Sequence, residues 1–178
     1  MSCLLCYHND CYIKIAGLTL EKSGLLLLTH TGNPVSIHKT MITIFVKDCN
    51  QISQSFYDSV IFDLQLHQMT CSCSHSACLS VHGYYWRSVK LPSGTLRLRV
   101  CRVKCSECGT THALLLSSMV PYSQILLSDQ QRICNDYEEG RSISMVCETN
   151  PSIDENNVKS ILRNYRLCWR EKLRSLRI

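Results

Sequence analysis

Two groups of cysteines in the middle of the chain have the composition and spacing of metal ligands. In Cys105-Ser-Glu-Cys108-Gly109, two thiolates two residues apart can face one ion, and the glycine lets the backbone turn around a sulfur. Tetrahedral zinc requires two further ligands. The upstream candidates for them are Cys71, Cys73, His75 and Cys78.

We predict a structural Zn²⁺ ion held by Cys73, Cys78, Cys105 and Cys108, with Cys71 or His75 as replacements in the upstream pair. That pair stays open because neither Cys71 with Cys73 nor Cys73 with Cys78 has the usual two-residue gap. A catalytic zinc is disfavoured, since only Glu107 lies inside this segment as a general base. The competing interpretations are buried apolar cysteines and a redox dithiol, which would require a βαβ context. A second, weaker candidate is Cys3-x2-Cys6-x-His8-x2-Cys11.

Composition narrows the class of protein. The 178 residues carry 13 cysteines, 19 basic and 14 acidic side chains, for a net charge of +5. This charge permits an anionic partner without requiring one. Apolar runs are far shorter than the roughly 20 residues of a membrane span, and the N-terminus lacks the pattern of a secretory signal. We therefore expect a cytoplasmic protein with reduced thiols, no membrane association and no small-molecule substrate.

Apolar periodicity predicts the elements that position these residues. Alternation predicts strands over Met41–Val46, Val81–Val89 and Thr95–Lys104, and apolar residues four apart predict a helix within 48–66. Helices are predicted over Ser128–Gly140, Ser142–Thr149 and Ile153–Leu176. The predicted fold class is α+β, a small β-hairpin zinc ribbon followed by a three-helix helix-turn-helix domain. The predicted divisions are 1–40, an upstream extension that is poorly ordered or a mis-called start; 41–68, a strand–helix lead-in; 69–120, the zinc ribbon; and 121–178, the helix-turn-helix.

Two regions of the sequence are candidates for DNA contact. Between residues 67 and 120, six basic residues face Glu107 alone. The third predicted helix would place polar and basic side chains in a major groove, although Asp154 and Glu155 at its start oppose this. The predicted DNA-binding residues are Arg87, Lys90, Arg97, Arg99, Arg102, Lys104, Asn156, Asn157, Lys159, Ser160, Arg163 and Arg166. The alternative is a plain helical bundle with a solvated basic face.

The order and spacing of four motifs from residue 71 to 124 resemble a bacterial family of small uncharacterised zinc-ribbon proteins. These are similar in turn to the N-terminal zinc-ribbon and helix-turn-helix segment of insertion-sequence transposases. The resemblance covers Met41 to about Leu173. Its motifs are Cys71–Cys78, His82-Gly-Tyr-Tyr-Trp-Arg87, Leu98 to Leu115 and Val120-Pro-Tyr-Ser-Gln124.

The resemblance implies DNA binding at a transposon end or an operator, and the partner we expect is double-stranded DNA, with monomer or homodimer left open. It does not imply catalysis, because the RNase H-like domain that carries three carboxylates in such transposases has no counterpart here. We expect a transposase-like DNA-binding protein that is not an enzyme. The alternatives are a zinc-dependent protein-interaction module and a remnant of a longer transposase.

Overall fold

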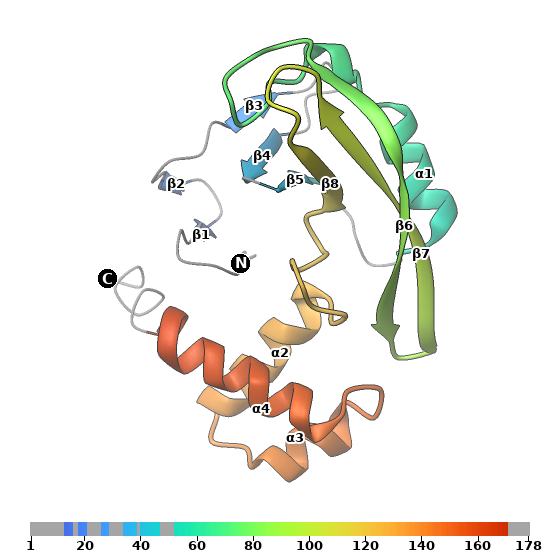
Figure 1. The fold of residues 1–178 in the computed structure, drawn as a ribbon. Coiled ribbons are helices and arrows are strands. Elements are labelled where there is room, and N and C mark those ends of the chain that lie inside the picture. The colour runs from blue at the N-terminus through green and yellow to red at the C-terminus, as the bar shows by residue number, and fades with distance from the viewer. Residues whose placement is uncertain are drawn as a thin grey trace.

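A β-hairpin and the strand that follows it form one side of a larger mixed sheet in the computed structural model of the chain (Figure 1). The structure describes the backbone of four short strands within 13–38, and residues 40–46 and 52–170 in full. The strands are β1 (Ile13–Ile15), β2 (Leu18–Leu20), β3 (Leu26–Leu28), β4 (Pro34–His38), β5 (Met41–Ile44), β6 (Leu79–Leu91), β7 (Gly94–Cys105) and β8 (Thr111–Leu116). The helices are α1 (Gln54–Phe62), α2 (Leu127–Glu138), α3 (Ile143–Thr149) and α4 (Glu155–Asn164), with a 3₁₀ turn at Leu66–Gln68 and a π-helical turn at Tyr165–Trp169.

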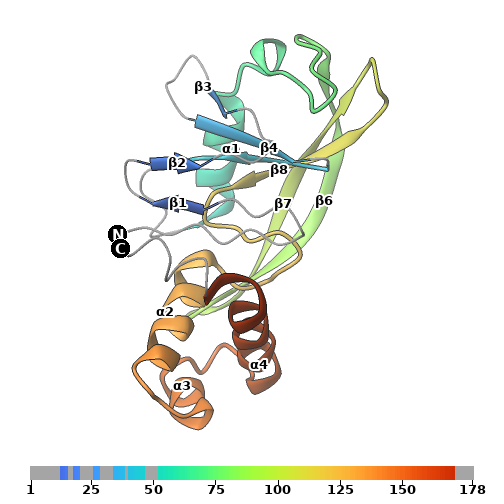
Figure 2. The ribbon, with the colours of Figure 1, turned by 90° about the vertical axis from the view of Figure 1, so that its left-hand side faces the viewer.

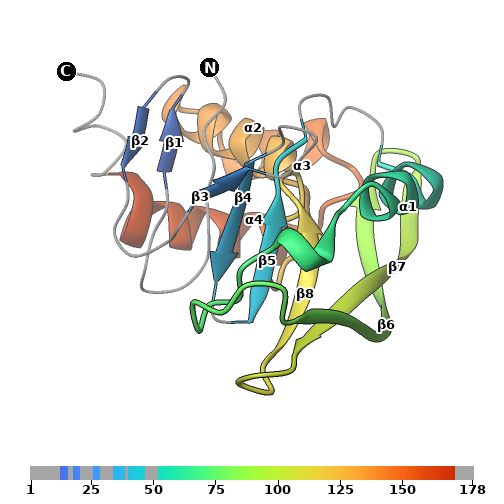
Figure 3. The same cartoon turned by 90° about the horizontal axis from the view of Figure 1, so that it is seen from above.

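Among the described residues, the main sheet has six strands in the order β3-β4-β5-β8-β7-β6. The pairing of β5 with β8 is parallel, with Ile42 opposite Leu114, and the other pairings are antiparallel. Figure 3 shows β4, β5 and β8 side by side. The strands β1 and β2 form a separate antiparallel pair. Within residues 1–40, which the sequence predicted to be an upstream extension, the strands β3 and β4 are part of the main sheet.

The predicted fold class is wrong. The hairpin is not a small independent ribbon, because residues Arg102–Lys104 of β7 pair with β8, and β8 pairs with β5. Sequence reasoning missed β8 because Leu114, Leu115 and Leu116 are all fully buried and show no alternation. A strand covered on both faces has a continuous apolar sequence, which periodicity alone does not identify.

The predicted hairpin strands are present, and β6 is longer than expected. Leu91 pairs with Gly94 across a two-residue turn, and a β-bulge between Val81 and Gly83 shifts the register. The apolar residues Leu98 and Val100 point into the core of the sheet. Helix α1 covers this part of the sheet, where the Tyr57 side chain is fully buried. The buried side of β7 therefore changes along the strand: Leu98 and Val100 are buried on one side, and Cys101 and Val103 on the other.

The three C-terminal helices lie close together (Figure 2), and they share a second apolar core. Ser142 caps α3 by accepting a hydrogen bond from the Met145 N–H, and Asp154 caps α4 in the same way through Asn157. The last predicted helix is not uniformly α-helical, because α4 ends at Asn164 and the π-helical turn follows directly. Residues 171–176 of the predicted helix lie outside the described residues. The buried residues of this core include Ile133, Val146, Val158, Leu162 and Trp169. In the described part of the chain, no helix combines the length and apolar character needed to cross a bilayer.

Candidate metal centre

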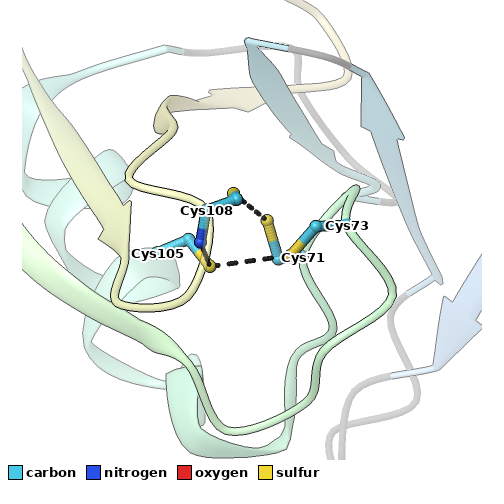
Figure 4. Close-up of side chains that lie close together, drawn as sticks. All are labelled: Cys71, Cys73, Cys105 and Cys108. Atoms are coloured by element: carbon cyan, nitrogen blue, oxygen red, sulfur yellow. Dashed lines mark hydrogen bonds between the residues drawn. The ribbon is translucent and has the colours of Figure 1, made fainter.

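Four cysteine sulfurs from two loops converge beside the end of the hairpin (Figure 4). Cys71 and Cys73 precede β6, and Cys105 and Cys108 lie at the end of β7 and just beyond it. All four sulfur atoms lie within 4.8 Å of one another. The Sγ–Sγ distance is 3.7 Å from Cys71 to Cys108 and also from Cys73 to Cys105. These distances exceed the S–S bond of about 2.05 Å, so the sulfurs form an open cluster of thiols that can hold a metal ion.

Hydrogen bonds around Cys105 fix the shape of the downstream loop. The Cys105 N–H donates to the Thr110 carbonyl at 3.0 Å, and the Gly109 N–H donates to the Cys105 carbonyl at 3.1 Å. Gly109 has φ of 70°, a left-handed conformation that glycine adopts without steric cost. The Cys108 N–H points at Cys105 Sγ at 3.5 Å. The segment from Cys105 to Cys108 therefore forms the knuckle that its two-residue spacing predicts.

The upstream loop depends on two non-glycine residues in left-handed conformations. Ser74 and Ala77 have φ of 70° and 57°. The Cys71 N–H donates to the His75 carbonyl at 2.9 Å, which closes the loop and turns Cys71 and Cys73 toward the downstream knuckle.

The structure gathers three of the four preferred ligands, together with one of the replacements. Cys78 is not among the four converging sulfurs, and its thiol donates to the His75 carbonyl at 3.1 Å. His75 supplies that carbonyl and no ring atom to the cluster. Cys71 occupies the fourth position. The motif Cys3-x2-Cys6-x-His8-x2-Cys11 lies outside the described residues.

His112 in β8 adds a buried imidazole to the edge of the cluster. Its side chain is fully buried, and Nε2 lies 3.3 Å from Cys71 Sγ. A ring N–H directed at a ligating sulfur is the kind of supporting contact that orients metal ligands. Because β8 lies inside the main sheet, between β5 and β7, this contact joins the cluster to that sheet.

The surroundings of the four thiols favour two thiolates in the downstream knuckle. The backbone N–H of Cys108 lowers the pKa of Cys105 to about 6, and hydrogen bonds from Thr110 lower the pKa of Cys108. In the upstream loop, the hydrogen bond at His75 lowers the pKa of Cys73, but burial and the neighbouring thiols outweigh it and raise the value to about 12. Four adjacent anions would repel one another, so a cation is needed to hold all four as thiolates.

The hairpin distributes its predicted DNA-binding cations over two faces. In β7, Arg97 and Arg99 are on one face, and Arg102 and Lys104 on the other, because successive side chains of a strand alternate. All four side chains are exposed, and no ion pair of theirs with a carboxylate is present among the described residues.

Other predicted DNA-binding residues have internal partners. Arg87 donates hydrogen bonds to the Val120 and Ser123 carbonyls, and Lys90 forms an ion pair with Asp154 at 2.7 Å. In α4, Lys159 forms an ion pair with Glu155 at 2.7 Å, and Asn157 donates hydrogen bonds to the Asp154 carboxylate. Asn157 and Ser160 also line a groove of about 470 Å³ with residues 122–125. Asn156 and Arg163 are exposed, and Arg166 lies over the Tyr137 ring at 5.9 Å.

Two exposed aromatic residues on the hairpin were missed by sequence reasoning. Tyr84 and Trp86 lie on the same face as Arg97 and Arg99, in register with Cys101 and Arg99 respectively. We call these four residues the aromatic–arginine patch. The signal was available, since two aromatics at a spacing of two must share a face of a strand.

The segment that carries the cysteine cluster and the hairpin matches one family of proteins. Residues 70–151, less than half of the chain, match a family described as Domain of unknown function (DUF6431). This region contains the four cysteines, the hairpin and β8. No curated protein and no solved structure matches the chain.

Proposed function

We propose that this protein binds DNA through the phosphates that face its β6–β7 hairpin, and that a structural zinc ion in the four-cysteine cluster fixes the base of that hairpin. The observation that carries this proposal is the set of four exposed cations on β7, without carboxylate partners among the described residues. The resemblance to transposase DNA-binding segments supports the same partner.

The sulfur geometry supports zinc as the ion. Zinc–sulfur bonds are about 2.3 Å long, so a tetrahedral ion holds its sulfur ligands about 3.8 Å apart. The Cys71–Cys108 and Cys73–Cys105 distances of 3.7 Å fit this value. Four protein thiolates leave no open position for water or substrate, which is typical of a structural site. The ion would join the loop before β6 to the knuckle after β7.

The distribution of charge supports an anionic polymer as the partner. Within residues 67–120, six basic residues face the single acid Glu107. Arg102 and Lys104 are exposed on one side of β7, while Arg97 and Arg99 are exposed on the other. A DNA backbone presents closely spaced phosphates, and release of their counterions favours binding to such cations.

The start of α4 is a weaker candidate for DNA contact. Asp154 and Glu155 place two negative charges there, and their partners Lys90 and Lys159 only neutralise them. Negative charge also stabilises a helix N-terminus without any ligand. We therefore place the phosphate contacts on the hairpin.

The experiment measures binding of the full chain, as purified with its metal, to a fluorescently labelled duplex over a range of salt concentrations. The logarithm of affinity should fall linearly with the logarithm of salt concentration, with a slope of about −0.9 for each phosphate neutralised. Arg102→Gln and Lys104→Gln should each reduce the magnitude of that slope by about 0.9, the value for one phosphate contact. Arg141→Gln is the matched control, because it removes one charge from a side chain already paired with Asp136 and Glu139.

Native mass spectrometry of the same sample tests the ion independently. One zinc per chain, lost together with cooperative folding on chelation, is the expected result. Absence of salt-dependent duplex binding by a folded, zinc-loaded chain would eliminate the DNA-binding proposal. Equal slopes in Arg102→Gln, Lys104→Gln and Arg141→Gln would eliminate the hairpin as the contact surface.

A further inference from the structure

The outer face of the hairpin carries two stacked pairs of an arginine and an aromatic ring. Arg97 Cζ lies 5.3 Å from the centroid of the Trp86 ring, and Arg99 Cζ lies 4.8 Å from that of Tyr84. In register, Arg99 is opposite Trp86 and Arg97 is opposite Ser88, so each arginine reaches diagonally to its ring. The result is a row of four planar groups along two adjacent strands.

These rings remain open to solvent despite the arginines. The Trp86 residue is 60% exposed and Tyr84 is 53% exposed, although large aromatic residues are usually buried. Trp169, the other tryptophan of the chain, is only 4% exposed in the helical core. The patch therefore presents flat apolar surface and positive charge together.

From this arrangement we propose that the aromatic–arginine patch binds unpaired bases of single-stranded DNA. The inference deepens the DNA-binding function proposed above and rests on it. It specifies a strand with exposed base faces, such as a melted or frayed end, as the preferred substrate class.

The chemistry of the patch distinguishes an unpaired strand from a duplex. A duplex conceals its base faces within the helical stack and presents phosphates and groove edges. Aromatic rings and guanidinium planes can stack only on bases that have left that stack. Arg102 and Lys104, on the opposite face of β7, stack on no aromatic ring among the described residues and suit phosphates alone.

Charge complementarity also favours a nucleic acid strand over a protein partner. In the described part of the chain, neither Arg97 nor Arg99 has a carboxylate partner. An apolar protein surface placed here would remove both guanidinium groups from water without compensation. A single strand supplies flat bases for the rings and phosphates for the arginines.

The test uses the two tryptophans as separate reporters in the full, metal-loaded chain. Titration with a thymidine oligonucleotide of about 25 nucleotides should quench the fluorescence of exposed Trp86. Trp169→Phe should retain this quenching, and Trp86→Phe should abolish it. Quenching that persists in Trp86→Phe and disappears in Trp169→Phe would contradict binding at the patch.

Affinity measurements separate this inference from the proposed function. Trp86→Ala should weaken oligothymidine binding by about five- to a hundredfold, the range that loss of one base–aromatic stack produces. The affinity of Trp86→Ala for duplex DNA should change less than about threefold. Trp86→Phe should keep most of the affinity for single-stranded DNA. Phe62→Ala, which removes an 89% exposed ring from α1, is the matched control and should leave both affinities unchanged.

Zinc content and circular dichroism first establish that every variant is folded. Normal duplex binding with no effect of Trp86→Ala on oligothymidine would overturn the inference and leave the proposed function intact. Binding to neither ligand by the unmodified chain would overturn both. Markedly tighter binding to oligouridine RNA than to oligothymidine would overturn the assignment to DNA.

Discussion

The hydroxyl group of Tyr57 accepts a hydrogen bond from the backbone N–H of Cys101 at 2.9 Å. The same hydroxyl donates to the Leu114 carbonyl, also at 2.9 Å. Cys101 lies on β7 just before β7 pairs with β8, and Leu114 lies on β8 just after that pairing ends. The side chain from α1 thus satisfies two backbone groups where the two strands diverge, and its burial raises the pKa of Tyr57.

Removal of this hydroxyl should destabilise the fold. Tyr57→Phe leaves a buried N–H and a buried carbonyl without this partner, so the free energy of unfolding should fall by about 1–3 kcal/mol. Chemical denaturation measures the change. Tyr84→Phe is the control, because Tyr84 is half exposed and its substitution should cost little. Equal stability of the two variants would contradict the role of Tyr57.

Two serine substitutions in the upstream loop should have opposite effects on metal content. Cys73→Ser removes a sulfur of the cluster, so this variant should bind no stoichiometric zinc and should lose cooperative unfolding. Cys78→Ser should retain one zinc per chain, because its hydroxyl can replace the thiol as a donor to the His75 carbonyl. Native mass spectrometry provides the stoichiometry. Loss of zinc from Cys78→Ser with retention in Cys73→Ser would reassign the ligand set.

Arg87 should contribute to stability, because its guanidinium group is bonded to the loop between β8 and α2. It donates to the Val120 carbonyl and, at 2.6 Å, to the Ser123 carbonyl. Arg87→Met should lower the free energy of unfolding by about 1.5–3 kcal/mol, the range for hydrogen bonds from a charged donor. Arg97→Met, with a solvent-exposed side chain, should cost less than about 1 kcal/mol. Thermal and chemical unfolding that rank the two variants in reverse would disprove this assignment.

The ion pair between Lys90 and Asp154 predicts a dependence on pH. The Lys90 ammonium group and then the Asn157 N–H lower the pKa of Asp154 from 3.8 to about 2. Because the pKa is lower in the folded state, the stabilisation is complete above pH 3.8 and is lost as the pH falls through about 2. In Lys90→Gln the pKa of Asp154 should rise toward 3.8.

Carboxyl carbon NMR can measure the titration of Asp154 directly. Between pH 7 and about 4.5, the Asp154 signal should stay constant in the unmodified chain and should begin to shift in Lys90→Gln. Lys104→Gln removes an equal charge outside this pair and should leave the Asp154 titration unchanged. Identical titrations in all three proteins would show that Lys90 does not control the carboxyl group.

Local sequence patterns predicted some elements of the fold and not the way they assemble. Alternation in 95–104 identified β7, and Ser142 marked the start of α3 through its cap. The apolar run of β8 has no period, and its parallel partner β5 is about seventy residues earlier, so no local pattern reveals the pairing. The error in fold class follows from this one strand, because β8 turns a hairpin into the side of a sheet.

The candidate site was accessible to sequence reasoning only where the backbone follows a standard turn. Cys105 and Cys108 could be paired by their spacing because Gly109 provides the left-handed residue of the knuckle. Upstream, Ser74 and Ala77 adopt such conformations without a glycine to signal them. In the folded loop Cys71 and not Cys78 joins the cluster, which spacing could not reveal.

The central place of β8 has a consequence for synthesis on the ribosome. Strand β5 emerges early, but its parallel neighbour β8 is complete only at Leu116, after both cysteine-bearing loops and the whole hairpin have been made. At about 5–20 residues per second, the nascent chain waits several seconds with the β8-facing edge of β5 unpaired. Capture of an ion by the two loops would bring Cys105 and the start of β8 into place just as this edge needs its partner. Scarcity of the metal would therefore prolong exposure of an apolar strand and favour aggregation during translation.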